Sequence, residues 1–297
     1  MKSDAILAAY TSISYMNFIN YNGKIYESST PIITAGNRGL RYGDGLFETI
    51  RCKNGSPIFI DEHLSRLWNG LKLLNFEIPK LFSPDLLEKE INAILLKNKL
   101  KDARVRLSVF KGQGGLYDPE NASPNYLLET FPLKESSNSL NQNGLQCGIF
   151  SETKKIADKY SNIKHNNFLP YLLGAAYAKK NRLNDAIILN EHNNICDSTL
   201  ANIFIVKNKK IYSPALTEGC IAGVMRNFVI QSLRNTDWSV TECVITPEFL
   251  YDADEVFLTN AIRTIRWVAG IDNRSYGFSI TSDVFEFLKK TNPNVIC

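Results

Sequence analysis

The sequence predicts an α+β fold with two domains. Strand-like stretches, some paired as hairpins, are mixed with stretches at helical spacing in both halves of the chain. At roughly 150 residues per domain, a chain of 297 residues corresponds to two domains. The run 135–144 is rich in Ser, Asn and Gln, which is the composition of a linker. We therefore expect a small domain over residues 17–135, a linker over 136–144 and a large domain over 145–297.

Turn residues and apolar spacing indicate the elements of the first half. The pair Asn22-Gly23 is typical of a two-residue hairpin turn. Apolar residues at positions 64, 67, 71 and 74 repeat at helical spacing, and Asp61 is the expected N-cap of that helix. Three glycines between 39 and 45 precede an apolar run, which predicts a strand entered through a tight loop. The expected elements are a hairpin at 17–26, strands at 46–50, 56–60, 105–110 and 126–131, and helices at 61–74 and 84–96.

The second half follows the same rules. Small residues mark a helix over 170–182, and a glycine precedes the helix expected at 224–234. A closing helix is expected at 281–290. Strands are expected at 145–150, 185–190, 202–207, 210–213 and 255–259.

Composition and charge exclude several classes of protein. Hydrophobic residues make up 44% and charged residues 22% of the chain, which are globular proportions. A net charge of +4 over 297 residues is too small to indicate a nucleic-acid or membrane partner. The N-terminus has no convincing signal-peptide cleavage site, and Met16 offers an alternative start. Six cysteines with no CxxC pair and no His at metal-ligand spacing predict reduced thiols, no metal site and a cytoplasmic protein.

Four residues are candidates for chemistry, and each also has an ordinary structural explanation. Lys164 lies in a polar loop, where most lysines are simply solvated. Asp197 lies among apolar and small residues, which is also typical of an Asx turn between strands. Arg66 lies on an amphipathic helix, where an exposed arginine is common. Gly223 precedes a helix whose first N–H groups can hold a phosphate, although a plain helix start is the commoner case.

Taken in order, the segments around these residues resemble one family. They are 42–50 (YGDGLFETI), 62–67 (EHLSRL), 164–166 (KHN), 197–204 (DSTLANIF) and 223–226 (GVMR). The chain resembles the class IV (fold type IV) pyridoxal-phosphate enzymes, which include branched-chain aminotransferases, D-amino-acid aminotransferases and aminodeoxychorismate lyases. The resemblance extends from about residue 17 to about residue 285. It implies two α+β domains with pyridoxal 5'-phosphate between them, in a homodimer.

The resemblance implies a role for each matched residue. Lys164 corresponds to the Schiff-base lysine, which also moves the substrate α-proton. Asp197 corresponds to the carboxylate that faces the pyridine nitrogen, and Arg66 to an arginine that binds the phosphate. The further residues that the resemblance assigns to the cofactor are Asn202, Val224, Met225, Asn260 and Ala261. Those assigned to the substrate pocket are Phe47, Lys111 and Tyr117.

The sequence departs from the family pattern at positions that bear on the substrate. Asp197 replaces the usual glutamate, so either the backbone approaches the ring more closely or a water intervenes. The segment 111–117 lacks the Arg and His that grip the carboxylate in D-amino-acid relatives, which disfavours D-amino acids. The pair Gly114-Gly115 and the segment 259–263 look more like lyases. Lyases often have arginines at the positions of Lys111 and Leu116, so the subfamily signals conflict.

Two functions therefore remain open at the level of sequence. The first is an aminotransferase that acts on an amino acid, with a branched-chain-like substrate favoured. The alternative is 4-amino-4-deoxychorismate lyase, which releases pyruvate and 4-aminobenzoate. The sequence does not distinguish the substrate side chain, its stereochemistry or the keto-acid acceptor.

Overall fold

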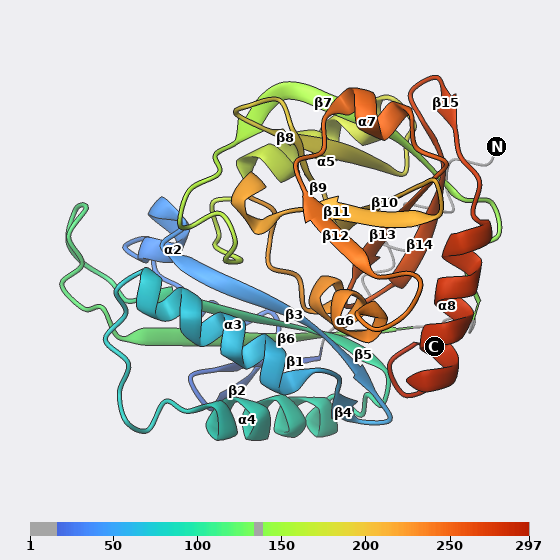
Figure 1. Ribbon diagram of the computed structural model, residues 1–297. Coiled ribbons are helices and arrows are strands. Elements are labelled where there is room, and N and C mark those ends of the chain that lie inside the picture. The colour runs from blue at the N-terminus through green and yellow to red at the C-terminus, as the bar shows by residue number, and fades with distance from the viewer. Residues whose placement is uncertain (1–16, 134–138, 297) are drawn as a thin grey trace. The chain divides into compact units, whose positions relative to one another are not determined.

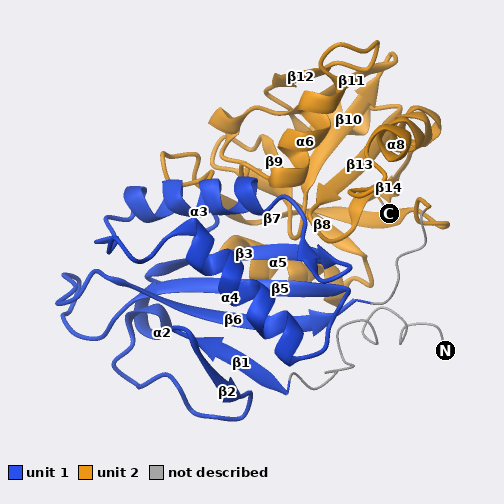
Figure 2. Ribbon diagram, turned by 90° about the horizontal axis from the view of Figure 1, so that it is seen from below, with its two compact units in different colours: residues 1–135, 163–167 blue, residues 136–162, 168–297 orange. Residues whose placement is uncertain are grey.

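The computed structural model describes residues 17–133 and 139–296, and its secondary structure is labelled in Figure 1. The chain divides into two compact units (Figure 2). Unit 1 contains residues 1–135 and 163–167, and unit 2 contains residues 136–162 and 168–297. The expected linker at 136–144 lies where unit 2 begins, although its residues 136–138 fall outside the described part of the chain. The return of 163–167 to unit 1 has no counterpart in the expected domain boundaries.

Unit 1 contains a six-stranded antiparallel sheet in the order β2-β1-β6-β5-β3-β4. Its strands are β1 (Phe18–Tyr21), β2 (Lys24–Glu27), β3 (Gly45–Lys53), β4 (Ser56–Pro57), β5 (Ala103–Lys111) and β6 (Pro124–Pro132). Asn22 and Gly23, which join β1 to β2, have φ angles of 51° and 80°. A two-residue hairpin turn of type I′ requires such angles at both positions, so the expected hairpin is confirmed.

Helices α3 (Ile60–Leu73) and α4 (Pro84–Lys97) cover one face of this sheet. Helix α3 packs on β3, α4 packs on β1 and β6, and the two helices contact each other. The sheet face that they cover carries Leu46, Ile50, Val105 and Leu107, all of which are buried. The amphipathic spacing seen in the sequence therefore corresponds to the core of unit 1.

Three local expectations in unit 1 were wrong. Helix α3 begins at Ile60, because Phe59 has a left-handed φ of 57° and occupies the N-cap position. Asp61 is therefore not the N-cap but lies in the first turn, where its charge favours the helix dipole. The strand expected at 56–60 shrinks to the two residues of β4. The glycine-rich loop contains a short helix, α2 (Arg38–Tyr42), which ends at Gly43 with φ 63°.

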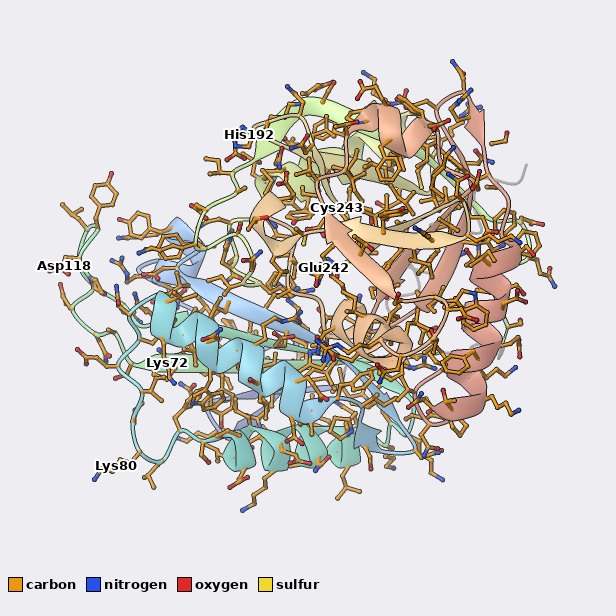
Figure 3. The ribbon with its side chains drawn as sticks, in the orientation of Figure 1. Lys72, Lys80, Asp118, His192, Glu242 and Cys243 are labelled. Carbon is orange, nitrogen blue, oxygen red and sulfur yellow. The ribbon has the colours of Figure 1, made fainter. Side chains whose placement is uncertain are left out.

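Unit 2 contains a mixed nine-stranded sheet in the order β12-β11-β10-β13-β14-β7-β8-β9, with β15 paired to β14. Its strands are β7 (Leu145–Lys155), β8 (Asp185–Asn190), β9 (Ile195–Ser198), β10 (Asn202–Lys207), β11 (Lys210–Pro214), β12 (Val240–Cys243), β13 (Glu255–Asn260), β14 (Thr264–Ile271) and β15 (Arg274–Ser275). Its helices are α5 (Leu169–Lys180), the 3-10 turn η1 (Leu216–Glu218), α6 (Val224–Leu233), α7 (Pro247–Tyr251) and α8 (Ser279–Thr291). The edge strand β12 carries Glu242, labelled in Figure 3, which forms an ion pair with Arg226 of α6.

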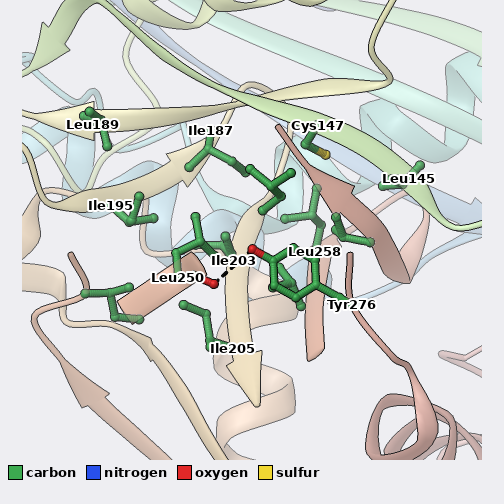
Figure 4. Close-up of a cluster of buried hydrophobic side chains, with 14 residues drawn as sticks. Leu145, Cys147, Ile187, Leu189, Ile195, Ile203, Ile205, Leu250, Leu258 and Tyr276 are labelled. Atoms are coloured by element: carbon green, nitrogen blue, oxygen red, sulfur yellow. Dashed lines mark hydrogen bonds between the residues drawn. The ribbon is translucent and has the colours of Figure 1, made fainter. Parts of the chain in front are cut away.

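An aliphatic cluster on one face of the central strands forms the largest part of the unit 2 core (Figure 4). Ile187 on β8, Ile203 and Ile205 on β10 and Val256 on β13 are each 0% exposed. The hydroxyl of Tyr276 at the edge of this cluster donates to the carbonyl of Leu250 at 3.0 Å. The strands that hold the candidate residues of unit 2 therefore pack on a buried aliphatic core.

The mixture of helices and strands in both units confirms the α+β prediction. Five cysteines in the described ranges are free thiols: Cys52, Cys147, Cys196, Cys220 and Cys243. Within the same ranges, no group of His, Cys, Asp and Glu side chains is arranged to hold a metal ion. No helix in the described ranges has the length and apolar character needed to cross a membrane.

Candidate functional site

The segment that carries Lys164 is held against the start of β3. The N–H of Phe47 donates to the carbonyl of Lys164 at 2.9 Å, and the N–H of Asn166 donates to the carbonyl of Gly45 at 2.9 Å. A Cβ at Gly45 would lie 2.4 Å from the carbonyl oxygen of Val109 and 2.8 Å from the Asn166 side chain. Glycine is thus required at this position, and one purpose of the glycine-rich run is to let the Lys164 segment approach.

Two cationic side chains share the aromatic ring of Phe47. The ammonium of Lys164 lies 4.7 Å from the ring centroid, and the guanidinium carbon of Arg106 lies 4.0 Å from it. Arg106 is opposite Thr49 in the β3–β5 ladder. Its side chain lies on the side of the sheet opposite to the side that α3 covers. The sequence showed Arg104 and Arg106 in alternation along this strand, but it gave no reason to connect Arg106 with Lys164.

Arg66 is fixed by a buried carboxylate on β3. Its Nε and one Nη donate to the two oxygens of Glu48 at 2.8 and 2.5 Å, a bidentate pair. Glu48 is 1% exposed and also contacts Nδ1 of His63 at 2.7 Å. Burial alone would raise the pKa of Glu48, but Arg66 and His63 outweigh it and hold the pKa at about 2.

The pKa of the buried His63 ring is lowered in this cluster. Burial is the main cause, the hydrogen bond and charge of Glu48 oppose it, and the positive charges of Arg66 and Lys164 act in the same direction as burial. Because Glu48 is ionised, Nδ1 carries the proton and donates to it. Nε2 of His63 is buried and has no hydrogen-bond partner among the described residues. Arg66, Glu48 and His63 therefore form a cluster that fixes the arginine rather than leaving it on the helix surface.

Asp197 lies on β9 at the centre of a buried polar network in unit 2. Its Oδ2 accepts from the Tyr171 hydroxyl at 2.7 Å and from the N–H of Ile221 at 2.9 Å. Its Oδ1 accepts from Nδ2 of Asn202 at 2.8 Å, and Nζ of Lys155 lies 3.5 Å from Oδ2. Burial raises the pKa of Asp197, and these four partners oppose that rise. Asp197 is therefore a strand residue, and the Asx-turn explanation is wrong.

The start of helix α6 is built close to Asp197. Asn202 bonds to the Asp197 carboxylate and also donates to the carbonyl of Ile221 at 2.8 Å. The N-cap is Gly223, which offers no side chain to the free N–H groups of the first turn. A Cβ at Gly223 would lie 1.9 Å from Oδ1 of Asn202, so the close approach requires glycine. Val224 and Met225 are the first two residues of the helix.

The remaining candidate residues lie in two other settings. Asn260 ends β13, donates to the carbonyl of Leu200 at 3.1 Å and accepts from the N–H groups of Ile262 and Arg263, which fixes the turn that contains Ala261. Lys111 donates to the carbonyl of Leu74 at 2.8 Å and lies 3.4 Å from Asp44, so its ammonium is already engaged within unit 1.

Tyr117 is 88% exposed, and its ring is tilted against that of Tyr42 with the centroids 5.9 Å apart. Within unit 1 the structure thus brings Phe47 and Lys164 together, and within unit 2 it brings Asp197 and Asn202 together with the start of α6. Sequence reasoning placed Glu48 only on the strand that lines the site, without its partners. It missed the other side chains that complete these groups: His63 and Arg106 in unit 1, and Lys155 and Tyr171 in unit 2.

Known proteins are similar to this chain over most of its length. The family model described as "Amino-transferase class IV" matches residues 45–271. An aminodeoxychorismate lyase of Vibrio harveyi is 30% identical over 241 residues, which cover 80% of this chain and 87% of that protein. A branched-chain-amino-acid aminotransferase of Pseudomonas aeruginosa is 26% identical over 283 residues, which cover 91% of this chain and 90% of that protein.

A solved structure shows the same fold. The branched-chain aminotransferase of Thermoproteus uzoniensis, crystallised with norvaline, superimposes with a TM-score of 0.83 at 22% identity. The match covers 92% of this chain and 93% of that chain.

Proposed function

This chain belongs to the class IV aminotransferase family and has its two-domain α+β fold, and from that premise we propose that it is a pyridoxal-phosphate enzyme whose Lys164 bonds covalently to the cofactor. The family depends on pyridoxal phosphate. The observation that carries the proposal is the pair of groups already described. In unit 1 the amine of Lys164 and the guanidinium of Arg106 lie against the buried ring of Phe47, and in unit 2 a buried carboxylate lies beside the N-terminus of a helix.

The residues of unit 2 fit the cofactor chemically. A carboxylate accepts about four hydrogen bonds, and Oδ1 of Asp197 accepts one from the described residues, that of Asn202. Oδ1 therefore has room for the N–H of a protonated pyridine ring. The uncapped first turn of α6 offers the backbone N–H groups of Val224 and Met225 to a phosphate. Arg226 is not a phosphate ligand in this assignment, because it is paired with Glu242.

Each residue then has a task that follows from its surroundings. When bound, the cofactor supplies the electron sink for a bond broken at the substrate carbon. The amine of Lys164 accepts the proton from that carbon and returns a proton to the product. Asp197 keeps a proton on the ring nitrogen through Oδ1. Arg66, fixed by Glu48, contributes its charge to the phosphate.

We further propose that the activity is that of an aminodeoxychorismate lyase. A substrate with more than one carboxylate suits the cationic setting of the Phe47 ring, where Arg106 and Lys164 converge. A branched apolar side chain gains nothing beside a guanidinium, which it would have to desolvate. The 30% identity to the Vibrio harveyi lyase supports the same assignment.

An aminotransferase that acts on an amino acid is the second candidate. It is supported by the Pseudomonas aeruginosa relative, whose match extends over 91% of this chain, and by the engagement of Lys111 with Leu74 and Asp44. Lyases often carry an arginine at the position of Lys111, and because of that engagement Lys111 offers no free cation there. A branched-chain-like substrate remains favoured over D-amino acids within this candidate.

A single assay separates the two candidates. Purified protein loaded with pyridoxal phosphate is mixed with aminodeoxychorismate in the absence of any keto acid. The lyase releases pyruvate, followed with lactate dehydrogenase, together with fluorescent 4-aminobenzoate over many turnovers. An aminotransferase gives no sustained product until a keto acid is added to a branched-chain amino acid. Activity in neither arm would refute both assignments, and Lys164→Ala gives the blank.

The family resemblance also leads us to propose a homodimer, and the cysteine pattern leads us to propose a cytoplasmic protein. Light scattering at micromolar concentration tests the oligomeric state. A fully active monomer would contradict the dimer without affecting the assignment of Lys164.

A further inference from the structure

Lys155 is a buried lysine that the proposed reaction does not use. It ends β7 and is 6% exposed. Its ammonium donates to the carbonyl of Ser161 at 2.9 Å and to the Tyr171 hydroxyl at 2.7 Å, and it lies 3.5 Å from Oδ2 of Asp197. A buried ammonium is costly unless it is paired and hydrogen-bonded, and this one is both. Three oxygen atoms of the protein therefore engage this side chain.

The two oxygens of Asp197 have different surroundings. Oδ2 faces the cationic side, with Lys155, the Tyr171 hydroxyl and the N–H of Ile221. Oδ1 has the neutral amide of Asn202 as its partner among the described residues. A ligand that donates a hydrogen bond to Asp197 thus binds at Oδ1, whereas Lys155 lies next to Oδ2.

We propose that Lys155 is a positioning residue for Asp197. It makes Asp197 a weaker base than a ligand that is hydrogen-bonded to Oδ1, so that the proton they share stays on the ligand. This inference rests on the proposed function, because the ligand in question is the pyridine nitrogen of the cofactor.

The Coulomb energy between two charges falls with the distance between them. The ammonium lies 3.5 Å from the carboxylate, whereas a group at Oδ1 is separated from it by the width of that carboxylate and a hydrogen bond. The positive charge of Lys155 therefore lowers the proton affinity of Asp197 more than that of the ligand. Without it, three neutral hydrogen-bond donors alone would oppose the burial of a carboxylate that is 2% exposed, and the shared proton would move toward Asp197.

Tyr171 makes this arrangement rigid. Its hydroxyl accepts from Lys155 and donates to Asp197, both at 2.7 Å, so one oxygen connects the two charges. Its ring stacks on Phe168 with the centroids 4.5 Å apart. The carboxylate plane is consequently fixed from the Oδ2 side, and Oδ1 is directed by Asn202.

The test is the ¹⁵N chemical shift of the ring nitrogen in protein loaded with ¹⁵N-labelled pyridoxal phosphate. Wild type is expected to show the protonated-ring value. Lys155→Met and Lys155→Gln, both neutral, are expected to move the signal toward the unprotonated value. Lys155→Arg restores the charge and is expected to restore the wild-type signal. Lys154→Met, on the neighbouring residue of the same strand, is the matched control and should leave the signal unchanged.

The outcomes separate this inference from the proposed function. If both neutral variants retain the protonated-ring signal, the inference is overturned while the cofactor assignment stands. If the wild type neither retains the cofactor nor bonds it to Lys164 after borohydride reduction, the proposed function has failed, and this inference with it. The glutamine variant keeps a polar group toward Ser161 and Tyr171, which makes it the better folded of the two neutral variants.

Discussion

Replacing Glu48 by glutamine removes the negative charge that Arg66 and His63 share inside unit 1. The carboxylate is 1% exposed, and its pKa falls from 4.5 to about 2 because its partners favour the ionised form. A fall of that size corresponds to about 3 kcal/mol, at roughly 1.4 kcal/mol for each tenfold change in an equilibrium constant. Breaking a buried ion pair from one side also costs about 3–5 kcal/mol, because the remaining charge is uncompensated.

The sign of the pH dependence follows from the direction of the pKa change. A carboxyl group with a lowered folded-state pKa stabilises the fold above its unfolded pKa, and this contribution is lost as the pH falls from about 4.5 to about 2. Wild type should therefore lose stability in this window. Glu48→Gln should already be less stable at pH 7, by about 3 kcal/mol, and should lose less on acidification.

Urea unfolding followed by tryptophan fluorescence and circular dichroism at pH 7 and pH 3 measures both effects. Glu62→Gln, an exposed position on helix α3 next to His63, is the matched control and should change the free energy of unfolding by less than about 0.5 kcal/mol. If Glu48→Gln unfolded with the wild-type free energy and the wild-type slope in acid, the ionised and buried state of Glu48 would be refuted.

Three further substitutions test the roles of individual side chains. Asp197→Asn should slow proton removal from the substrate by about a hundredfold or more while cofactor affinity changes less, as rapid-quench kinetics can show. Asp197→Glu should also lose activity, because the extra methylene overpacks a site with four partners. Near-full turnover of both variants would mean that Asp197 has only a structural role. Arg66→Ala should weaken cofactor affinity by about ten- to a hundredfold, the loss of one charge-assisted pair, measured by fluorescence titration of the apo-protein; unchanged affinity would mean that Arg66 serves Glu48 alone. Arg106→Met should raise KM for a dicarboxylate substrate by about tenfold or more with little change in kcat. Arg104→Met, two residues away on the same face of the sheet, should raise KM less. Equal effects of the two substitutions would mean that Arg106 does not bind the substrate.

Much of the fold was predictable because its signals are local. The hairpin at Asn22-Gly23 and helices α3 and α4 follow from turn chemistry and apolar spacing within a few residues. The start of α3 was not predictable in the same way. Phe59 adopts a left-handed conformation that its residue type does not favour, so Asp61 could not be recognised as a first-turn residue rather than a cap.

In the candidate site too, residues with local signals could be predicted and their distant partners could not. Lys164, Arg66 and Asp197 stood out because each is an unusual residue for its local pattern. Their partners are distant in sequence: Lys155 is 42 residues from Asp197 and Glu48 is 18 residues from Arg66. Such pairs form through strand pairing and helix packing, which a single sequence does not display. The return of residues 163–167 to β3 is a further case, because it depends on hydrogen bonds to Gly45 and Phe47.

The covalent position of the cofactor tests the central claim most directly. Protein loaded with pyridoxal phosphate is reduced with borohydride and digested, and the modified peptide is identified by mass spectrometry. We predict that the pyridoxyl group is found on Lys164, whose amine lies 4.7 Å from the centroid of the Phe47 ring, whereas the ammonium of Lys155 is engaged by Ser161, Tyr171 and Asp197. Modification of Lys155 or of another lysine, with Lys164 unmodified, would contradict the assignment of the reactive amine.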